Sequence, residues 1–349
     1  MSLSSPQGIE GSSAREIATT QDLLIFMDPP RHTDMRRTLS RAFTPRAVKL
    51  LQEEIERRSR AIVGAVAKRG AVDFVRDIAA EPPLQVIAEI MGVPQDDREQ
   101  IFLWTNASFG SEDPEVRAES AERGAALGGL VRYALGLADR RRQHPDNDIA
   151  SVLVSAEIGL TDMEFVMFFV LLTQAGNETT RTLLSQGLLQ LVAHPEAIEE
   201  LREEPDRMKN AVEEMLRIES PVLGMCRTAT NDVELHGQTV RQGDTLTMWF
   251  VSGNRDESTF EDPAVFDIHR HNAAQHQSFG GGGPHFRLGA ALARMEAQAV
   301  VGEIVEQLDD VHIRGPVQRL RSNFVNGIKR IPLSCAPRRH AIHEPWSAE

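Results

Sequence analysis

The most continuous hydrophobic stretch of the chain follows residues 161–164 (TDME), which have the spacing of a helix N-cap and capping box. The stretch predicts a helix over about 162–193, longer than an ordinary surface helix. Apolar residues occupy nearly every side of it from 165 to 172, so we expect this helix to be buried. Its middle, however, has the sequence AGNETT over 175–180. A glycine costs ~1 kcal/mol relative to alanine inside a helix, so this polar break favours a functional position over a polar defect packed on water.

Periodic apolar positions predict helices along most of the remaining chain. One begins just after Pro29-Pro30, and another is N-capped by Thr44 and stops at Gly70. The other predicted helices are a pair over 73–92 interrupted at Pro82-Pro83, one around Trp104, one over 116–143 and one over 206–219.

The short strands that the pattern predicts lie towards the C-terminal half. Residues 1–22 are small and polar and are expected to be loop, and 340–349 to be a flexible tail. The whole chain, 1–349, is predicted as one mainly α domain with small β hairpins. The predicted strands are a hairpin over 233–240 with His236-Gly237 as its turn, a short strand over 246–251 and a closing strand over 328–333.

Composition narrows the class of protein. With 349 residues, 41 % of them hydrophobic, the chain can bury a sizeable core. Its 51 acidic residues outnumber 38 basic ones, and the formal net charge of −13 argues against nucleic-acid binding. The chain has neither an unbroken apolar run of about 18 residues nor the basic and apolar regions of a signal peptide. We therefore expect a cytoplasmic protein without a membrane anchor. Its two cysteines, Cys226 and Cys335, give no disulfide framework.

The glycine-rich segment 278–296 (SFGGGGPHFRLGAALARME) carries the most specific chemical signal. Its second half predicts a helix from about Leu288 with one apolar face. Glycines before a helix N-terminus suit a bound anion, and they also let a backbone pass close to a bulky group. The phosphate-binding pattern Gly-x-x-x-x-Gly-Lys-Ser/Thr is absent, and no strand with βαβ spacing leads in. The four glycines alone therefore decide little.

As a whole, the segment resembles the haem-binding loop of the cytochromes P450, which has the pattern Phe-Gly-Gly-x-Gly-x-His-x-Cys-x-Gly in members with one additional glycine. Arg287 stands where that family has its cysteine. The longer form of the loop looks like that of bacterial members that oxidise sterol side chains or branched lipids. The positions that match in register are Phe279, Gly280, Gly281, Gly283, His285 and Gly289.

Residues 28–36 (DPPRHTDMR) resemble a second motif of the family. A bare His-x-x-x-Arg spacing, here His32 and Arg36, predicts only a solvated basic helix face. In the Asp-Pro-Pro context, the resemblance assigns both side chains to the haem propionates. It assigns Arg227 and His285 to the propionates as well.

The polar break of the long helix resembles the family's central helix, where O2 binds. Ala175 and Gly176 match the small residues of that motif, and Glu178 and Thr179 match its acid and threonine. In the family this acid and threonine relay protons, so the resemblance implies that role for Glu178 and Thr179.

Glu214 and Arg217 have a Glu-x-x-Arg spacing that is usually only a minor surface pair. In the family the pair is buried and completed by a later arginine in a Pro-x-Arg-Phe segment. This chain has PAVF at 263–266 instead, which leaves Arg255 or Arg270 as a substitute.

Two departures bear on function. The resemblance begins near the propionate-binding helix, so we expect the family's N-terminal helix and sheet strands to be absent. The cysteine thiolate is the family's iron ligand, whereas Arg287 has five N–H donors, no acceptor and a pKa above ~12. The resemblance thus implies haem b as the cofactor, bound weakly or not at all, and provides no protein ligand for the metal.

Three functional hypotheses follow. The first is a haem monooxygenase by descent that hydroxylates a hydrophobic small molecule, supplied with electrons by a ferredoxin-type partner and impaired by Arg287. The second is a non-catalytic homologue that acts as a helper or partner-binding protein. The third is a haem protein with altered ligation, with His285 on the iron. As it stands, the chain is predicted to lack normal monooxygenase activity.

Overall fold

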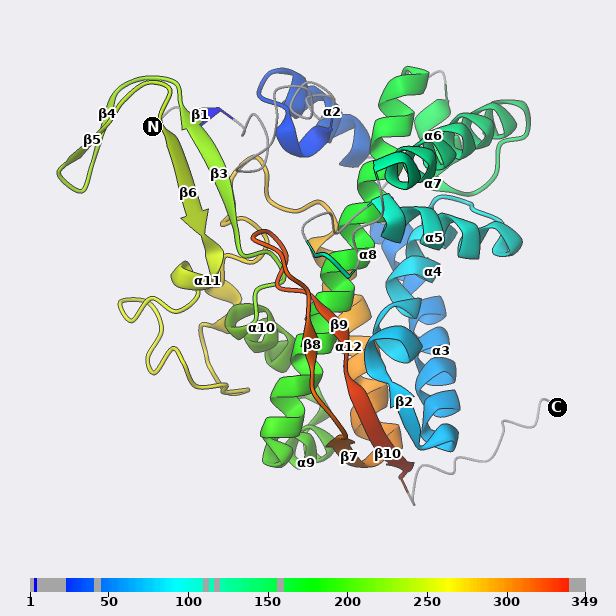
Figure 1. The fold of residues 1–349 in the computed structure, drawn as a ribbon, viewed down its shortest axis with the longest axis vertical. Coiled ribbons are helices and arrows are strands. Elements are labelled where there is room, and N and C mark those ends of the chain that lie inside the picture. The colour runs from blue at the N-terminus through cyan, green and yellow to red at the C-terminus, as the bar shows by residue number, and fades with distance from the viewer. Residues whose placement is uncertain are drawn as a thin grey trace.

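The computed structural model describes residues 3–4, 23–40, 45–108, 113–115, 120–155 and 160–338. Over these residues helices dominate, and the strands form small antiparallel sheets (Figure 1). The prediction of a mainly α fold with small sheets is confirmed.

Helix α8 (Asp162–Ala193) runs through the middle of the molecule (Figure 1). Its predicted capping box is present, since the Glu164 backbone N–H donates to Thr161 Oγ1 at 3.2 Å and the Thr161 N–H donates to the Glu164 carboxylate at 3.0 Å. The helices packed around it are α4 (Glu81–Ile90), α6 (Ser120–Gln143), α10 (Met208–Ile218) and α12 (Ala290–Gln307).

The remaining helices extend this arrangement. Helix α3 (Pro45–Arg69) lies along α12 and ends at Gly70, whose φ of 73° lets the chain turn away from the helix. The others are α2 (Arg31–Ser40), α5 (Arg98–Ser108), α7 (Ile149–Val154), α9 (Pro195–Glu203) and the short α11 (Phe250–Gly253).

All strand pairs are antiparallel. In one sheet β3 (Gly224–Ala229) lies between β1 (Leu3–Ser4) and β6 (Thr245–Trp249). In another, β10 (Pro332–Pro337) lies between β2 (Ala71–Asp73) and β7 (Leu308–Ile313). The two-stranded pairs are β4 (Val233–Leu235) with β5 (Gln238–Val240), turning at His236-Gly237 as predicted, and β8 (Gln318–Arg319) with β9 (Ile328–Arg330).

Several predicted boundaries differ from the structure. Pro82 and Pro83 do not interrupt a helix pair, because they occupy the first turn of α4, where a missing N–H costs nothing. A π-helical turn, Val75–Ala79, precedes them. The last helix begins at Ala290 and not near Leu288, an ordinary shift for a helix end.

The strand predictions need similar correction. Leu3–Ser4 form β1 within the expected N-terminal loop. The closing strand is split at Ile331, so that its halves join different sheets, and the strand over 246–251 ends at Trp249. Thr44 and 340–349 lie outside the described residues.

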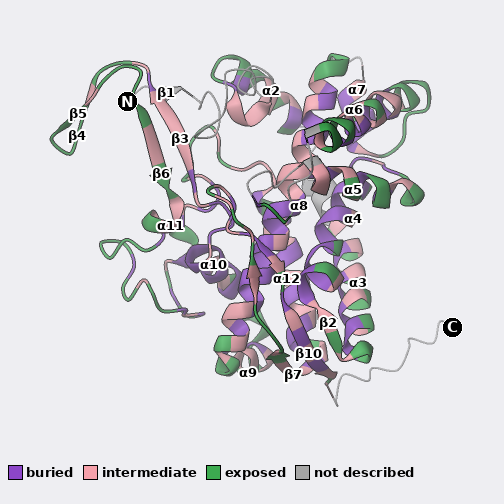
Figure 2. Ribbon diagram, viewed as in Figure 1, coloured by how far each residue is buried: buried purple, intermediate pink, exposed green. Residues whose placement is uncertain are grey.

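The apolar core forms two clusters that share α8 (Figure 2). Phe165, Val166 and Phe169 of its first half pack with α4, α5, α6 and α7. Leu184, Leu188 and neighbouring residues of its second half pack with α3, α10, α12 and the β10 sheet. The polar break at 175–180 therefore falls between two well-packed regions.

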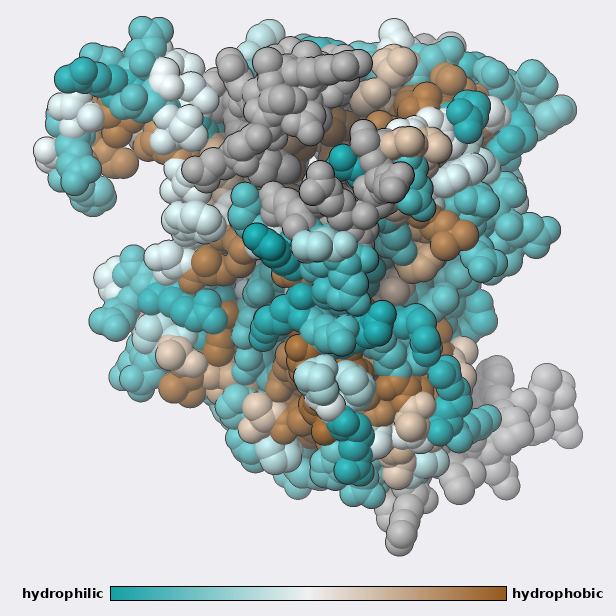
Figure 3. Space-filling view, viewed as in Figure 1, coloured by the Kyte–Doolittle hydropathy of each residue, from teal (hydrophilic) through white to brown (hydrophobic). Residues whose placement is uncertain are grey.

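The face drawn in Figure 3 is covered mostly by hydrophilic side chains, with hydrophobic ones in separate patches between them. None of the described helices combines the length and apolar character that a membrane-spanning helix needs.

The Glu-x-x-Arg pair is buried. Arg217 holds Glu214 through two hydrogen bonds of 2.7 Å, and both side chains have no exposed surface. Arg270 completes the group, since its Nε donates to Glu214 Oε1 at 3.1 Å. Arg255 instead donates to the Ile218 carbonyl and is exposed. Of the two candidates for the third position, Arg270 is the one the fold uses.

We expect Arg270→Met to lower the free energy of unfolding by about 3 kcal/mol, because it removes the hydrogen bonds that Arg270 donates to the buried Glu214 carboxylate and to three backbone carbonyls. Arg255→Met is the matched control and should cost less than ~1 kcal/mol. Urea denaturation measures both, and equal losses would contradict the assignment.

Candidate functional site

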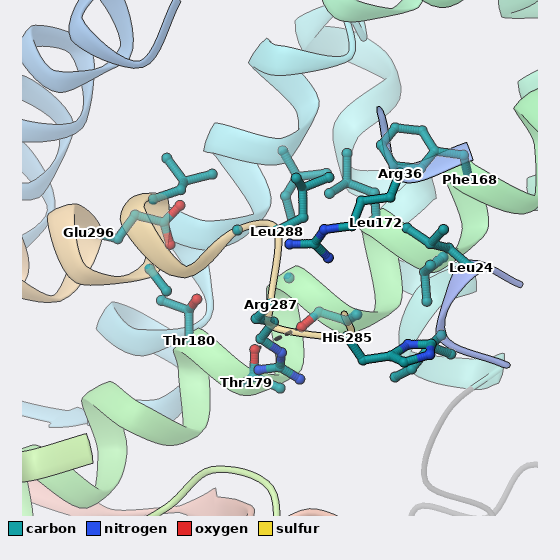
Figure 4. A pocket seen from close by; sticks show the side chains of 18 of the residues that line it. Leu24, Arg36, Phe168, Leu172, Thr179, Thr180, His285, Arg287, Leu288 and Glu296 are labelled. Atoms are coloured by element: carbon teal, nitrogen blue, oxygen red, sulfur yellow. Dashed lines mark hydrogen bonds between the residues drawn. The ribbon is translucent and has the colours of Figure 1, made fainter. Parts of the chain in front are cut away.

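A cavity of about 160 Å³ opens where the polar break of α8 faces α4, α2 and the start of α12 (Figure 4). Most of its wall is apolar, and the polar groups gather at particular places. Figure 4 shows Glu296 and Thr180 on one side, Arg36 and Leu24 on the other. The apolar side chains in the wall are Leu24, Ile25, Ile87, Phe168, Leu171, Leu172, Leu288, Leu292 and Ala293.

The break in α8 makes room for this cavity at Gly176 and satisfies the Thr179 hydroxyl within the helix. A Cβ added to Gly176 would lie 2.6 Å from Ile87 Cδ1, so the glycine lets α4 pack closely at the cavity edge. Thr179 Oγ1 donates to the Ala175 carbonyl at 2.7 Å, a helix-internal bond that satisfies a buried hydroxyl. Ala175, Gly176 and Thr179 all line the cavity, and their functional role stays a prediction.

Glu178 takes a different direction. It is buried, forms an ion pair with Arg181 one turn away, and is not part of the cavity wall. Its Oε1 lies next to Gly327 and has no hydrogen-bond partner among the described residues. The structure therefore separates Glu178 from Thr179, although the two are neighbours in sequence.

One end of the cavity gathers cationic and imidazole groups. The rings of His32 and His285 lie with centroids 4.0 Å apart, and His32 Nδ1 is buried without a hydrogen-bond partner among the described residues. Arg36 reaches the same end from α2. Arg227 lies behind the wall, donates to the Cys226 carbonyl at 2.7 Å, and is near enough to influence both imidazoles.

Burial is the main cause that lowers the pKa values of the basic groups at this end, and for the two imidazoles nearby positive charges add to it. Burial, followed by His32 and Arg227, lowers the pKa of His285 to about 4, and burial followed by Arg36 lowers that of His32. Burial also lowers the pKa of Arg36 and of Arg227. Asp28 is the acid that opposes these shifts. An anionic group bound here would relieve the repulsion.

Arg287 follows a tight loop. Its N–H donates to the Phe279 carbonyl at 3.0 Å, and Gly280 has a φ of 93°, which suits glycine. The Arg287 side chain lines the cavity and is partly buried. Burial lowers its pKa to about 10, so it is still a cation at pH 7. Within the described part of the chain, no carboxylate pairs with it.

Phe279 and Gly280 shape the loop from behind and do not line the cavity. The Phe279 ring packs under the Arg294 guanidinium at 4.5 Å, and Arg294 is paired with Glu213. Gly289, which is the N-cap of α12, does line the cavity.

Glu296 was missed by sequence reasoning. It lies on α12 with 2 % of its surface exposed, in the cavity wall opposite the cationic end. Burial raises its pKa to about 8, against a hydrogen bond donated by the Thr180 hydroxyl. The available signal was position: Glu296 follows Leu292 by one helical turn, on the apolar face of a predicted helix.

Comparison with known proteins decides the family. The family model "Cytochrome P450" matches residues 136–324. The chain belongs to the cytochrome P450 family. It is 42 % identical over 310 residues to a steroid C26-monooxygenase of Rhodococcus jostii, covering 88 % of this chain and 64 % of that protein. It is 39 % identical to a methyl-branched lipid omega-hydroxylase of Mycobacterium bovis, covering 91 % and 76 %. The chain thus spans less than two thirds of the Rhodococcus relative.

Solved structures agree with the fold. P450BioI in complex with hexadec-9Z-enoic acid ligated acyl carrier protein superposes with a TM-score of 0.87 at 31 % identity, covering 95 % of this chain and 87 % of that one. A Mycobacterium marinum cytochrome P450 in complex with pseudoionone gives 0.86 at 38 % identity, covering 91 % and 79 %. Members of this family bind haem b, act on hydrophobic substrates and receive electrons from redox partners.

The cavity fits one part of haem and conflicts with another. The basic end of the cavity suits a dianionic group such as the two propionates. It contains Arg36, Arg227, His285 and His32, and the Nδ1 of His32 has no hydrogen-bond partner among the described residues. Arg287 has no lone pair to offer an iron and adds a positive charge beside it. Among the described residues, no cluster of three His, Cys, Asp or Glu side chains could hold a metal ion instead.

We expect Glu296 to make stability depend on pH. Because its pKa is raised from 4.5 to about 8 in the folded protein, the free energy of unfolding should fall as pH rises through that range. The difference between the wild type and Glu296→Gln should change by roughly 1.4 kcal/mol per pH unit. Urea denaturation between about pH 5 and 8 measures it. Glu306→Gln, exposed on the same helix, is the control, and parallel curves for wild type and Glu296→Gln would contradict the assignment.

Arg287→Met should raise the free energy of unfolding at pH 7 by about 1–3 kcal/mol, because a buried cation without a partner is costly and methionine suits the apolar wall. Arg37→Met, on the exposed side of α2, should stay within about 0.5 kcal/mol of the wild type. Thermal and urea denaturation compare the variants. A destabilised Arg287→Met protein would show that the guanidinium has a partner that stabilises it.

Proposed function

We propose that this chain descends from cytochrome P450 monooxygenases that use O2 to hydroxylate sterols or methyl-branched lipids, and that with Arg287 it lacks this activity. The observation that carries the proposal is the Arg287 cation in the cavity wall, at the position of the family's thiolate. A thiolate donates electron density to iron and favours O–O cleavage. A guanidinium supplies neither lone pair nor negative charge.

Two observations support a sterol or methyl-branched lipid as the substrate class: the apolar wall of the cavity and the names of two similar proteins. The cavity is lined mainly by leucine, isoleucine and phenylalanine side chains, which suit a large apolar molecule. Two similar proteins are named for steroid and methyl-branched lipid hydroxylation. We propose a ferredoxin-type electron donor for the active ancestor and for any variant in which the thiolate is restored.

The α8 residues support descent from an enzyme. We propose Thr179 Oγ1 as the group that hands protons into the cavity, since it lies in the wall. Glu178 would act from behind it as a buried carboxylate held by Arg181. A protein that only bound a partner would need neither a buried carboxylate nor a hydroxyl at this place.

A second candidate function is that of a non-catalytic homologue that helps a partner protein. Arg287 favours this candidate, because it stands where the monooxygenases have their thiolate. The hypothesis of an iron ligated by His285 finds no support, because the His285 ring packs on His32 at the cationic end. That position suits contact with a propionate.

We predict that the wild type, mixed with haem, reduced and exposed to CO, gives no Soret band of the thiolate type and no hydroxylated product with NADPH, ferredoxin and its reductase. Arg287→Cys should gain the band and, with a C27 steroid or a methyl-branched fatty acid, product. Arg287→Ser is the matched control, because it removes the cation without supplying a thiolate.

Each outcome has a clear meaning. A thiolate-type band in the wild type would show that another sulfur, such as Cys226, reaches the iron, and the role given to Arg287 would be wrong. Restoration in Arg287→Ser as well as in Arg287→Cys would also contradict the proposal. Haem binding by Arg287→Cys without product would favour the helper function.

A further inference from the structure

Arg287 places a charge in the cavity that no described residue of the wall neutralises. The guanidinium lines the cavity together with Leu288 and Leu292, is only partly exposed, and still carries its proton at pH 7. Burying an uncompensated charge is expensive. A guanidinium also presents its donors as a planar fork that matches a carboxylate. The chemistry that the cavity lacks is therefore an anion with two coplanar oxygens.

The rest of the wall restricts that anion to an amphipathic one. Ile87, Phe168, Leu172 and Leu292 come from three helices and line the same cavity as Arg287. A small inorganic anion would leave this lining without a partner, whereas an alkyl chain gains ≈ 0.8 kcal/mol for each CH₂ that it buries. The Arg287 cation and the apolar lining together favour a ligand that has an anionic head group and a long alkyl chain.

The opposite side does not repel such a ligand. Glu296, the carboxyl in the cavity wall, is hydrogen-bonded to Thr180 and holds its proton at pH 7. Glu178 is turned away from the cavity and paired with Arg181. The charged side chains that line the cavity together with the neutral Glu296 are therefore Arg287 and Arg36.

We propose that this cavity binds a long-chain carboxylate, with its head held by the Arg287 guanidinium and its alkyl chain along the apolar walls of α8, α4 and α12. The ligand occupies the place where haem lies in the family, so the two exclude each other. This inference rests on the proposed function in one respect, that position 287 offers no thiolate.

The test measures binding to the purified, haem-free chain at pH 7 by titration calorimetry. Dodecanoate is the probe, 1-dodecanol matches its chain without the charge, and acetate matches its head without the chain. The wild type should bind dodecanoate about tenfold or more tightly than 1-dodecanol, the ratio typical of a charge-assisted hydrogen-bonded contact. Acetate should bind far more weakly than either.

Variants locate the head group. Arg287→Met should lose the preference for the acid while keeping its affinity for 1-dodecanol, which also shows that the cavity is still folded. Arg287→Lys keeps the charge without the fork and should retain a reduced preference. Arg37→Met, whose guanidinium is exposed on α2, is the control and should bind as the wild type does.

Several results would overturn the proposal. They are a preference for dodecanoate that survives in Arg287→Met, a loss that follows Arg36→Met and not Arg287→Met, or acetate binding as tight as that of dodecanoate. Because no haem is present, this outcome is independent of the CO spectrum. The carboxylate inference can fail while the proposed loss of monooxygenase activity stands, and the reverse also holds.

Discussion

Helix α8 has to be buried along its whole length and yet leave a cavity halfway along. Its two ends meet this constraint by packing into separate apolar clusters. In the segment between them, Gly176 has no side chain and leaves space at the cavity edge. The Thr179 hydroxyl donates to the Ala175 carbonyl, and Thr180 forms a hydrogen bond with Glu296. Every other part of the site is placed relative to this break, since α4, α2 and the loop before α12 all meet α8 here.

The electrostatics of the cavity depend on one position more than on any other. A cysteine thiolate at 287 would put a negative charge in a low-dielectric wall, where it attracts a metal cation. Arginine puts a positive charge in the same wall, a reversal by two charge units in a place that water hardly screens. The groups suited to propionates, such as Arg36 and His32, line the same cavity. On the carboxylate proposal, the cavity favours anions both at these groups and at the position where the family binds a metal.

Sequence reasoning predicted the elements that depend on local signals. The capping box of α8, the hairpin turn at His236-Gly237 and the place of Arg36 and His285 near one another follow from spacing or from family motifs. Sequence reasoning could not predict in which direction a particular side chain points. A helix that is apolar nearly all round has no face marked by periodicity, so nothing in the sequence separates Thr179, in the wall, from Glu178, turned to Arg181. The choice of Arg270 over Arg255 likewise depends on how the loop after α11 folds back on α10.

Glu296 on α12 and Arg287 in the loop before it both line the cavity and can both ionise. Comparing them shows why the arginine needs a partner from outside the protein and the glutamate does not. Glu296 avoids the cost of a buried charge by keeping a proton, because burial raises its pKa to about 8. Arg287 cannot do the same at pH 7, because even a pKa lowered to about 10 leaves it protonated. The described residues provide it with no carboxylate. Without a ligand, the desolvation of Arg287 lowers the free energy of unfolding. A ligand with a negative charge removes this loss when it binds, and the same free energy then adds to its affinity.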